Sequence, residues 1–119
     1  MAMTVKRAIE LADGLRPNMI EEGKKADWVM ELEQRLKREL GEEYFPMAYP
    51  EEGETELLAK DGFEEIYVLW LCAKIDLALK EYDGWNASVA NLNALISDFK
   101  KQCLRDKLPE RRGFKGVYR

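Results

Sequence analysis

The chain has 119 residues, of which 46% are hydrophobic and 35% are charged, a composition typical of one soluble globular domain. It contains no histidine, no nucleotide-binding glycine loop and no closely spaced cysteine pair, so the usual general base and the usual zinc ligands are missing and no enzyme is expected. The formal net charge is −4, but residues 100–119 hold eight basic and two acidic residues, so an acidic body precedes a basic end.

Residues 4–15 predict a short amphipathic helix. Thr4 is a suitable N-cap, because its side-chain oxygen can accept a hydrogen bond from an early backbone amide. The apolar residues that follow share one helical face: Val5, Ala8, Ile9, Ala12 and Leu15. Pro17 pushes the residue before it out of the helical conformation, so the helix should end before this point.

A second, longer helix is predicted over residues 20–40. Asn18 and Glu21 have the spacing of a capping box at its start, and Gly41 suits the left-handed residue that follows its end. Its apolar residues recur mainly at steps of three and four: Ile20, Trp28, Val29, Leu32, Leu36 and Leu40. Gly23 weakens the first turn, so a start nearer Lys24 is an open alternative. The turn before it resembles the turn of a helix-turn-helix motif, but acidic residues at the start of the second helix would repel DNA phosphates.

Residues 41–60 have no helical periodicity and predict an ordered connection, with an extended segment within residues 55–60. Connections of this length inside a compact domain are usually functional or disordered, and the aromatic side chains here argue against disorder. We therefore take three aromatic residues as candidate partner contacts: Tyr44, Phe45 and Tyr49.

Asp61 and Glu64 have the spacing of a second capping box and predict a helix over residues 63–79. This helix is apolar on nearly all sides, so it should lie at the centre of the domain or on the face of an oligomer. Lys74 and Asp76 are the only charges within the run. They are candidate partner contacts, although a buried pair and two charges at a solvated helix edge remain alternative explanations.

A turn near residues 79–83 precedes a fourth helix, which is expected to run to about Leu104. Its apolar residues alternate steps of four and three, as in a coiled-coil seam: Trp85, Val89, Leu92, Ile96, Phe99 and Cys103. A short turn makes the last two helices antiparallel and places Phe63 near Phe99. The predicted fold class is therefore all-α, a small bundle of about four helices with a long antiparallel C-terminal helix hairpin.

The helical domain is expected to cover residues 1–106, and residues 107–119 to form a basic tail outside its core. Pro109 stops the last helix, and the glycines and arginines that follow are poor helix material. Four residues of the tail are candidate partner contacts: Arg111, Arg112, Phe114 and Tyr118. The two cysteines, Cys72 and Cys103, are far out of register in the predicted hairpin, so no disulfide is expected within the chain.

The stretch ELLAKDGFEEIYVLWLCAKIDLALKEYDGWNASVANLNALISDF, residues 56–99, has a recognisable pattern. Its recurring elements are Glu56-Leu57-Leu58, Phe63-Glu64-Glu65-Ile66-Tyr67, Ala73-Lys74-Ile75-Asp76, Glu81-Tyr82-Asp83, Trp85-Asn86 and Ser88. This pattern resembles small head–tail connector (adaptor) proteins of tailed phages and prophages in Gram-positive hosts, and the likeness covers roughly residues 3–105. Members of that group often have a glycine at the position before Glu81. This chain has Lys80 there and a glycine only at Gly84, so the resemblance predicts that the turn is shifted towards Gly84.

The resemblance implies a structural protein without catalytic, cofactor or metal site. It would form a ring below the portal, in the neck channel through which DNA passes, after assembly in the host cytoplasm. Its partners would be further copies of itself, the portal protein and the next neck or tail protein, with non-specific DNA contact and no membrane. Two alternatives remain open: a helical phage assembly module or chaperone acting as a monomer or dimer, and a DNA-associated regulator that uses the basic tail.

Overall fold

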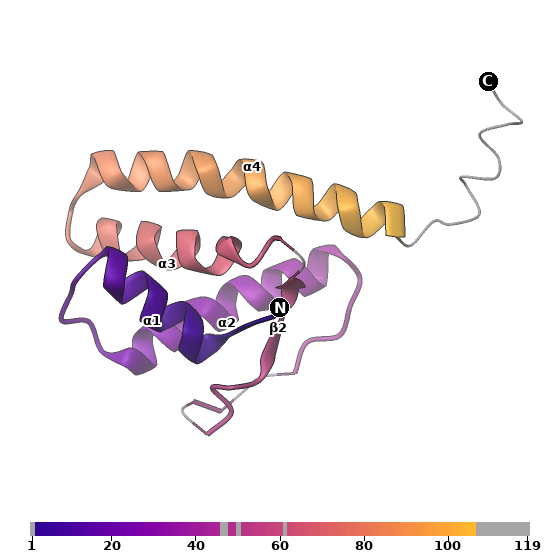
Figure 1. Cartoon of the computed structure of the whole chain (residues 1–119), viewed down its shortest axis with the longest axis horizontal. Helices are drawn as coiled ribbons and strands as arrows, with labels where there is room; N and C mark the ends of the chain where they lie inside the picture. Colours follow the sequence, from indigo (N-terminus) through magenta and orange to yellow (C-terminus); the bar gives the residue numbers. More distant parts are fainter. Residues whose placement is uncertain (1, 46–47, 50, 61, 107–119) are drawn as a thin grey trace, which may run out of the picture.

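The computed structural model describes residues 2–45, 48–49, 51–60 and 62–106 (Figure 1). The elements follow in the order β1 (Ala2–Thr4), α1 (Val5–Leu15), α2 (Glu22–Glu39), β2 (Glu56–Lys60), α3 (Glu65–Ala78) and α4 (Tyr82–Asp106). The predictions that concern Asp61 and the basic tail, residues 107–119, lie outside the described residues.

Four helices confirm the expected helical fold in its broad outline, but the all-α description is incomplete. β1 pairs with β2 in a small antiparallel sheet, in which Ala2 lies opposite Lys60 and Thr4 lies opposite Glu56. The extended segment within residues 55–60 was predicted, whereas β1 was not. A strand of three residues is too short for an alternating pattern to be visible in the sequence.

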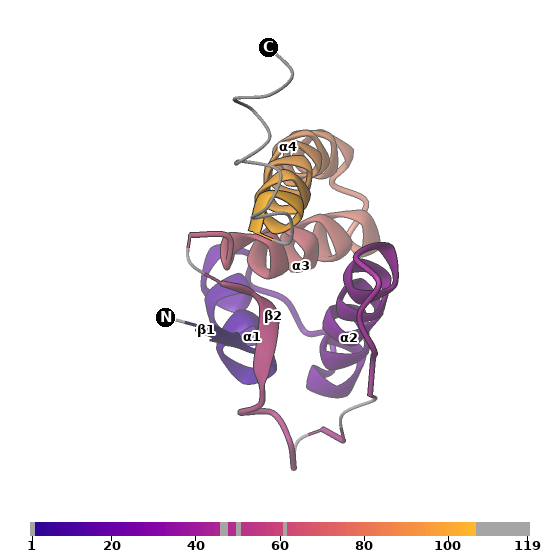
Figure 2. The same cartoon turned by 90° about the vertical axis from the view of Figure 1, so that its right-hand side faces the viewer.

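α3 lies at the centre of the molecule, with α1 and α2 on one side and α4 on the other (Figures 1 and 2). This position explains why its sequence is apolar on nearly all sides, and it confirms the first of the two expected locations. Its fully buried side chains include Ile66, Tyr67, Leu71 and Ile75. Burial of one such side chain contributes roughly 1.5–3 kcal/mol, so α3 supplies a large share of the core energy.

α4 lies alongside α3 in both views and buries one stripe of side chains against it. Leu92, Ile96 and Phe99 are buried, as the predicted seam requires, whereas Trp85 is only half-buried. The rings of Phe63 and Phe99 lie 5.4 Å apart between centroids, at an interplanar angle of 54°. That pair is the one expected from a short turn between the two helices.

The start of α1 was predicted correctly, α2 begins between its two expected starts, and α3 begins two residues later than expected. The hydroxyl oxygen of Thr4 accepts a hydrogen bond of 3.1 Å from the Arg7 amide. The Asn18 capping box is wrong, because α2 begins at Glu22 and the Asn18 side chain accepts a bond from the nearby Ile20 amide instead. An asparagine after a proline forms such a local turn readily.

At the start of α3, Glu64 does not have the position that the predicted capping box requires. Glu64 is itself the N-cap of α3, rather than the third helical residue, and its carboxylate accepts a hydrogen bond of 2.9 Å from the Gly62 amide. Gly62 has a positive φ of 102°, a conformation that a residue with a side chain adopts at a cost. The chain therefore turns at Gly62, and the helix starts only after that turn.

α2 and α3 end in the same way. Gly41 follows α2 with a φ of +74°, as predicted, and the Glu42 amide donates to the Lys37 carbonyl at 2.7 Å. Both bonds of this C-terminal motif are present, since the Gly41 amide donates to the Arg38 carbonyl. The backbone carbonyls of Lys37 and Arg38, in the last turn of α2, are thus satisfied without help from other elements.

After α3 the left-handed residue is Lys80, with a φ of +63°. Its amide donates to the Leu77 carbonyl at 3.1 Å, and the Glu81 amide donates to the Asp76 carbonyl at 2.7 Å. The expected shift of the turn towards Gly84 is therefore wrong. Lys80 occupies the conformation that normally favours glycine.

Candidate partner interface

One of the charged residues expected to contact a partner faces inward. The Asp76 side chain is 4% exposed, and the Arg16 guanidinium Nε donates to its two oxygens at 3.0 and 3.2 Å. The candidate assignment of Asp76 as a partner contact is therefore wrong. Burial of a carboxylate is tolerated here because Arg16, at the end of α1, neutralises it.

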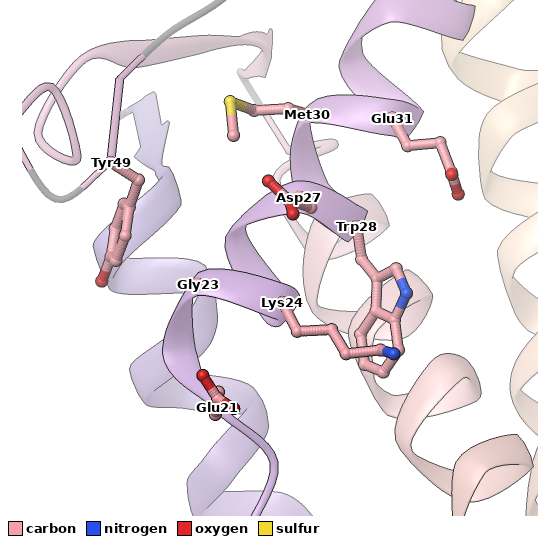
Figure 3. Close-up of a pocket in the computed structure, with 8 residues that line it drawn as sticks. All are labelled: Glu21, Gly23, Lys24, Asp27, Trp28, Met30, Glu31 and Tyr49. Carbon is pink, nitrogen blue, oxygen red and sulfur yellow. The ribbon is translucent and has the colours of Figure 1, made fainter.

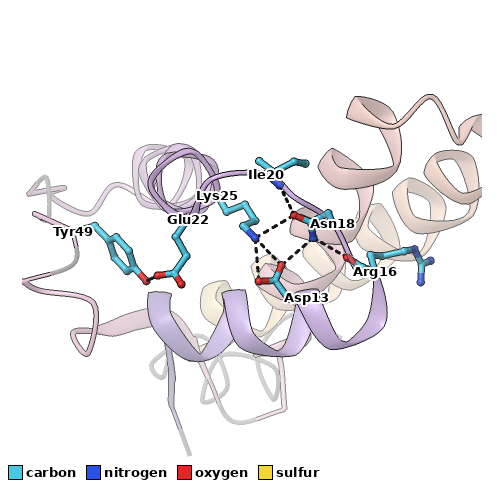
Figure 4. Close-up of polar contacts among 7 residues, drawn as sticks. All are labelled: Asp13, Arg16, Asn18, Ile20, Glu22, Lys25 and Tyr49. Atoms are coloured by element: carbon cyan, nitrogen blue, oxygen red, sulfur yellow. Dashed lines mark hydrogen bonds and ion pairs between the residues drawn. The ribbon is translucent and has the colours of Figure 1, made fainter.

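A second charged cluster joins the end of α1 to the start of α2 (Figure 4). The ammonium of Lys25, 4% exposed, donates to both oxygens of Asp13 at 2.8 and 3.0 Å and to Asn18 at 3.1 Å. Three donors thus meet three acceptors, which satisfies a buried lysine. Asn18 also donates to Asp13, so the turn and both helices are linked.

A third polar contact lies inside the core. The Tyr67 hydroxyl donates to Glu33 at 2.6 Å and accepts a bond of 2.9 Å from the Ala59 amide, while the Leu58 amide donates to Glu33 at 2.8 Å. Burial raises the pKa of the Glu33 carboxyl, and the bonds from Tyr67 and Leu58 oppose that rise. These contacts tie α2, β2 and α3 together and leave the group inaccessible to a partner.

The outward surface has a different character, because the three tryptophans of the protein gather there. Trp28 on α2, Trp70 on α3 and Trp85 on α4 are all half-buried, and Tyr49 in the connection after α2 adds a fourth ring. We call these four residues the aromatic band. The Trp70 indole nitrogen donates to the Trp28 carbonyl at 2.6 Å, which fixes the α2 and α3 portions of the band together.

Lys74, another candidate contact, lies beside this band. Its ammonium is 3.5 Å from Glu31 and 4.7 Å from the centre of the Trp70 ring, and it forms no ion pair with Asp76, a described residue of the same helix. The side chain is 28% exposed, so it remains open to a partner. A lysine over an indole face is attracted to its π-electrons and helps to hold the ring in place.

A broad hollow opens on one side of the band (Figure 3). It has a volume of about 670 Å³, and we call it the α2 hollow. Its lining comes mainly from the first half of α2: Glu21, Gly23, Lys24, Asp27, Trp28, Met30, Glu31 and Tyr49. Acidic side chains outnumber basic ones there, and an indole, a phenol and a thioether supply apolar surface.

A narrower groove of about 270 Å³ continues the band between α2, α3 and α4. Trp70 and Trp85 line it, together with Lys74 and with Leu77, which is 42% exposed. More exposed apolar side chains lie at the same end of the bundle: Leu15, Leu79 and Tyr82. Large apolar groups that remain half-exposed around aromatic anchors are typical of a surface that a protein partner covers.

The aromatic residues of the connection are divided between two environments. Tyr49 is half-buried and donates a hydrogen bond of 2.6 Å to Glu22. Burial and Glu22 raise its pKa to about 12, so its hydroxyl remains a donor at neutral pH. Tyr44 is half-buried, and its pKa is raised mainly by burial and to a smaller extent by the charge of Glu33. Phe45 is 69% exposed and is available to a partner.

Four candidate residues lie outside the described residues: Arg111, Arg112, Phe114 and Tyr118. Of the five others, the structure brings Tyr49 and Lys74 to the aromatic band and removes Asp76 from the surface. Sequence reasoning missed Trp28, Trp70 and Trp85 as members of one surface. Their number and their apolar size were visible, but they come from three different helices, and only the packing shows that Trp70 bonds to the Trp28 carbonyl and shares a groove with Trp85.

Within the described residues, no three potential ligands among histidine, cysteine, aspartate and glutamate are grouped so that they could hold a metal ion. Both cysteines are free thiols, and burial raises the pKa of Cys72, which keeps it a poor nucleophile. In the described part of the chain, no helix has the length and apolarity needed to cross a bilayer.

Comparison of the chain with protein-family models, with curated proteins and with solved structures gave no match.

Proposed function

We propose that this protein is a structural subunit of a phage or prophage neck, a head–tail connector that assembles into a ring below the portal. The observation that carries the proposal is the aromatic band with its hollow and groove. A domain of this size has little reason to keep three indoles half-exposed on one surface unless another protein covers them.

The distribution of charge supports a head-to-tail arrangement of copies. The α2 hollow is acidic, whereas the C-terminal end of α4 and the residues after it are basic. In a cyclic assembly each subunit offers two different patches, one to each neighbour. A chain with an acidic aromatic surface and a separate basic end has two patches of that kind.

The positions that carry the resemblance support the same proposal. They lie on or next to β2, α3 and the start of α4. Both helices of the proposed long hairpin therefore carry some of these positions. Connector proteins of the group often have a glycine at position 80, and Lys80 has the left-handed backbone that a glycine would adopt most easily. The residue type differs, but the backbone requirement is the one that the resemblance implies.

The aromatic band would also suit a helical interaction module or assembly chaperone that works as a monomer or dimer. A DNA-associated regulator is less well supported, because the α2 hollow is acidic and would repel phosphate. The mass of the protein in solution, measured alone and after mixing with the portal protein of the same phage or prophage, separates these functions. The proposal predicts a ring-sized oligomer, at least in the presence of the portal. A monomer or dimer in both conditions favours the module, and salt-sensitive DNA binding in place of assembly favours the regulator.

A further inference from the structure

We propose that the α2 hollow is the docking site for the basic tail, residues 107–119, of a second copy of this chain. The inference deepens the proposed function and rests on it, because it names the contact between neighbouring copies. Three properties of the hollow support it: its unpaired acidic groups, its aromatic walls and its distance from the tail of its own chain.

The charges of the two surfaces are complementary. The tail holds five basic residues and one acidic residue. Three carboxylates and one ammonium line the hollow, and two of these carboxylates, Glu21 and Asp27, are exposed and form no ion pair with any other residue that the structure describes. Opposite charges at the rim of an interface speed encounter and set the orientation of the partner.

The apolar part of the hollow suits the two aromatic residues of the tail. Trp28, Met30 and Tyr49 form its walls (Figure 3), and the bond from Tyr49 to Glu22 holds the phenol ring in one position. The ammonium of Lys24 already lies 5.9 Å from the centre of the Trp28 ring. An arginine of the tail could stack on such a ring face, since a guanidinium is planar and weakly hydrated.

The geometry favours a second copy over the tail of the same chain. Glu39, at the end of α2, forms an ion pair with Lys100 on α4, so the two helices are in register at that point. With 1.5 Å per helical residue, Trp28 lies about 17 Å behind Glu39, and Asp106 lies about 9 Å beyond Lys100 on α4. The path from Asp106 to Trp28 is therefore about 26 Å along the bundle, before any sideways offset between the helices.

Phe114 is eight residues after Asp106, and a fully extended chain covers at most about 29 Å over that length. Within one chain, Phe114 could reach Trp28 only if the tail were stretched nearly to its full length over the surface. The tail of a neighbouring copy has no such limit, and it can place its arginines and both of its aromatic residues at the hollow together.

A peptide of residues 107–119 tests the docking, because it contains no tryptophan and every tryptophan of the protein belongs to the aromatic band. Added to the full chain at a concentration where the chain is monomeric, it should change the tryptophan emission in a saturable way. Asp27→Arg should weaken binding about fivefold by replacing attraction with repulsion. The control is Asp98→Arg, the reversal of an exposed acidic residue on α4, which should leave the affinity within about twofold.

Three results would overturn the docking site: no saturable change in emission, equal weakening by both charge reversals, or full affinity of a peptide that carries Phe114→Ala and Tyr118→Ala. Equal weakening would mean that only overall charge matters. Full affinity of the alanine peptide would mean that the aromatic residues do not anchor it.

A photo-crosslinking benzoylphenylalanine at position 114 of the full chain tests the identity of the occupant. We expect crosslinked dimers in which position 114 is joined to residues 21–31 or to Tyr49. A crosslink confined to one chain would overturn the second copy as occupant. Failure of the ring proposal can be distinguished from failure of the docking proposal. If the peptide binds a chain that never forms rings, the docking site stands and the ring is wrong. If a chain ending at residue 106 still forms rings, the ring stands and the tail has no docking role.

Discussion

The backbone of Gly84 faces the carboxylate of Asp76 so closely that a Cβ at position 84 would lie 2.7 Å from the Oδ2 atom and 3.0 Å from Cγ. The carboxylate has little freedom to move away, because Arg16 holds both of its oxygens. The first turn of α4 thus rests on an ion pair that joins α1 to α3. A glycine inside a helix, which costs stability by itself, is explained by this close approach.

Gly84→Ala should destabilise the protein by about 1–3 kcal/mol, because the clash with Asp76 outweighs the better helix propensity of alanine. Urea unfolding followed by circular dichroism measures this change. The matched control is Gly14→Ala in α1, where nothing lies within 4 Å of the new Cβ and a gain of up to about 1 kcal/mol is expected. Unchanged stability of Gly84→Ala would mean that Asp76 is not held as described.

Lys80→Gly should stabilise the protein by about 1 kcal/mol, because glycine relieves the left-handed strain at the end of α3. The same substitution at Lys101, an exposed residue within α4, should have the opposite sign and cost up to about 1 kcal/mol. Thermal unfolding of the two variants gives the comparison. A loss of stability in both would contradict the conformation assigned to Lys80.

Truncation in the stripe that α4 buries should create cavities. Leu92→Ala and Ile96→Ala should each cost roughly 2–5 kcal/mol, since both side chains are at most 4% exposed. Asn91→Ala, on the exposed side of the same helix turn, should change the free energy of unfolding by less than about 0.5 kcal/mol. Similar losses at all three positions would refute the packing of α4 on α3.

Glu33 should make stability depend on pH in an unusual direction. Burial raises the pKa of its carboxyl above the ordinary value of 4.5, so the folded state holds the proton more tightly than the unfolded state does. The stabilisation from this group is complete below about pH 4.5 and is lost as the pH rises through the pKa of the folded state.

Glu33→Gln removes this titration. The difference in unfolding free energy between the original chain and the variant should therefore shrink as the pH rises from about 4 towards 8. Parallel urea titrations across this range measure the difference. A difference that grows with pH would mean that Glu33 is stabilised as a charged group, with Lys37 at 3.8 Å as its effective partner.

The sequence predicted the helices well because their apolar residues repeat at steps of three and four, and because Gly41 marks the end of α2. The starts of α2 and α3 were harder to place. Asn18 and Glu64 can each satisfy more than one nearby amide, and the choice depends on the turn that precedes the helix. β1 was missed because only its pairing with β2 makes it a strand.

The candidate interface could be predicted only in part. Tyr49 and Phe45 stood out as aromatic residues in a connection, but the direction of a side chain on a buried helix depends on its neighbours. Asp76 can be buried because it forms an ion pair with Arg16, which lies sixty residues earlier in the sequence. Glu33 did carry a sign of burial, since it lies on the same helical face as Val29 and Leu36.

Electron microscopy of the purified protein mixed with the portal protein of the proposed phage or prophage tests the central claim most directly. The account predicts rings of this chain, coaxial with the portal and joined to its tail-facing end, with an open channel along the axis. A portal without added density, together with a protein that stays monomeric or dimeric at the same concentration, would contradict the assignment as a connector subunit.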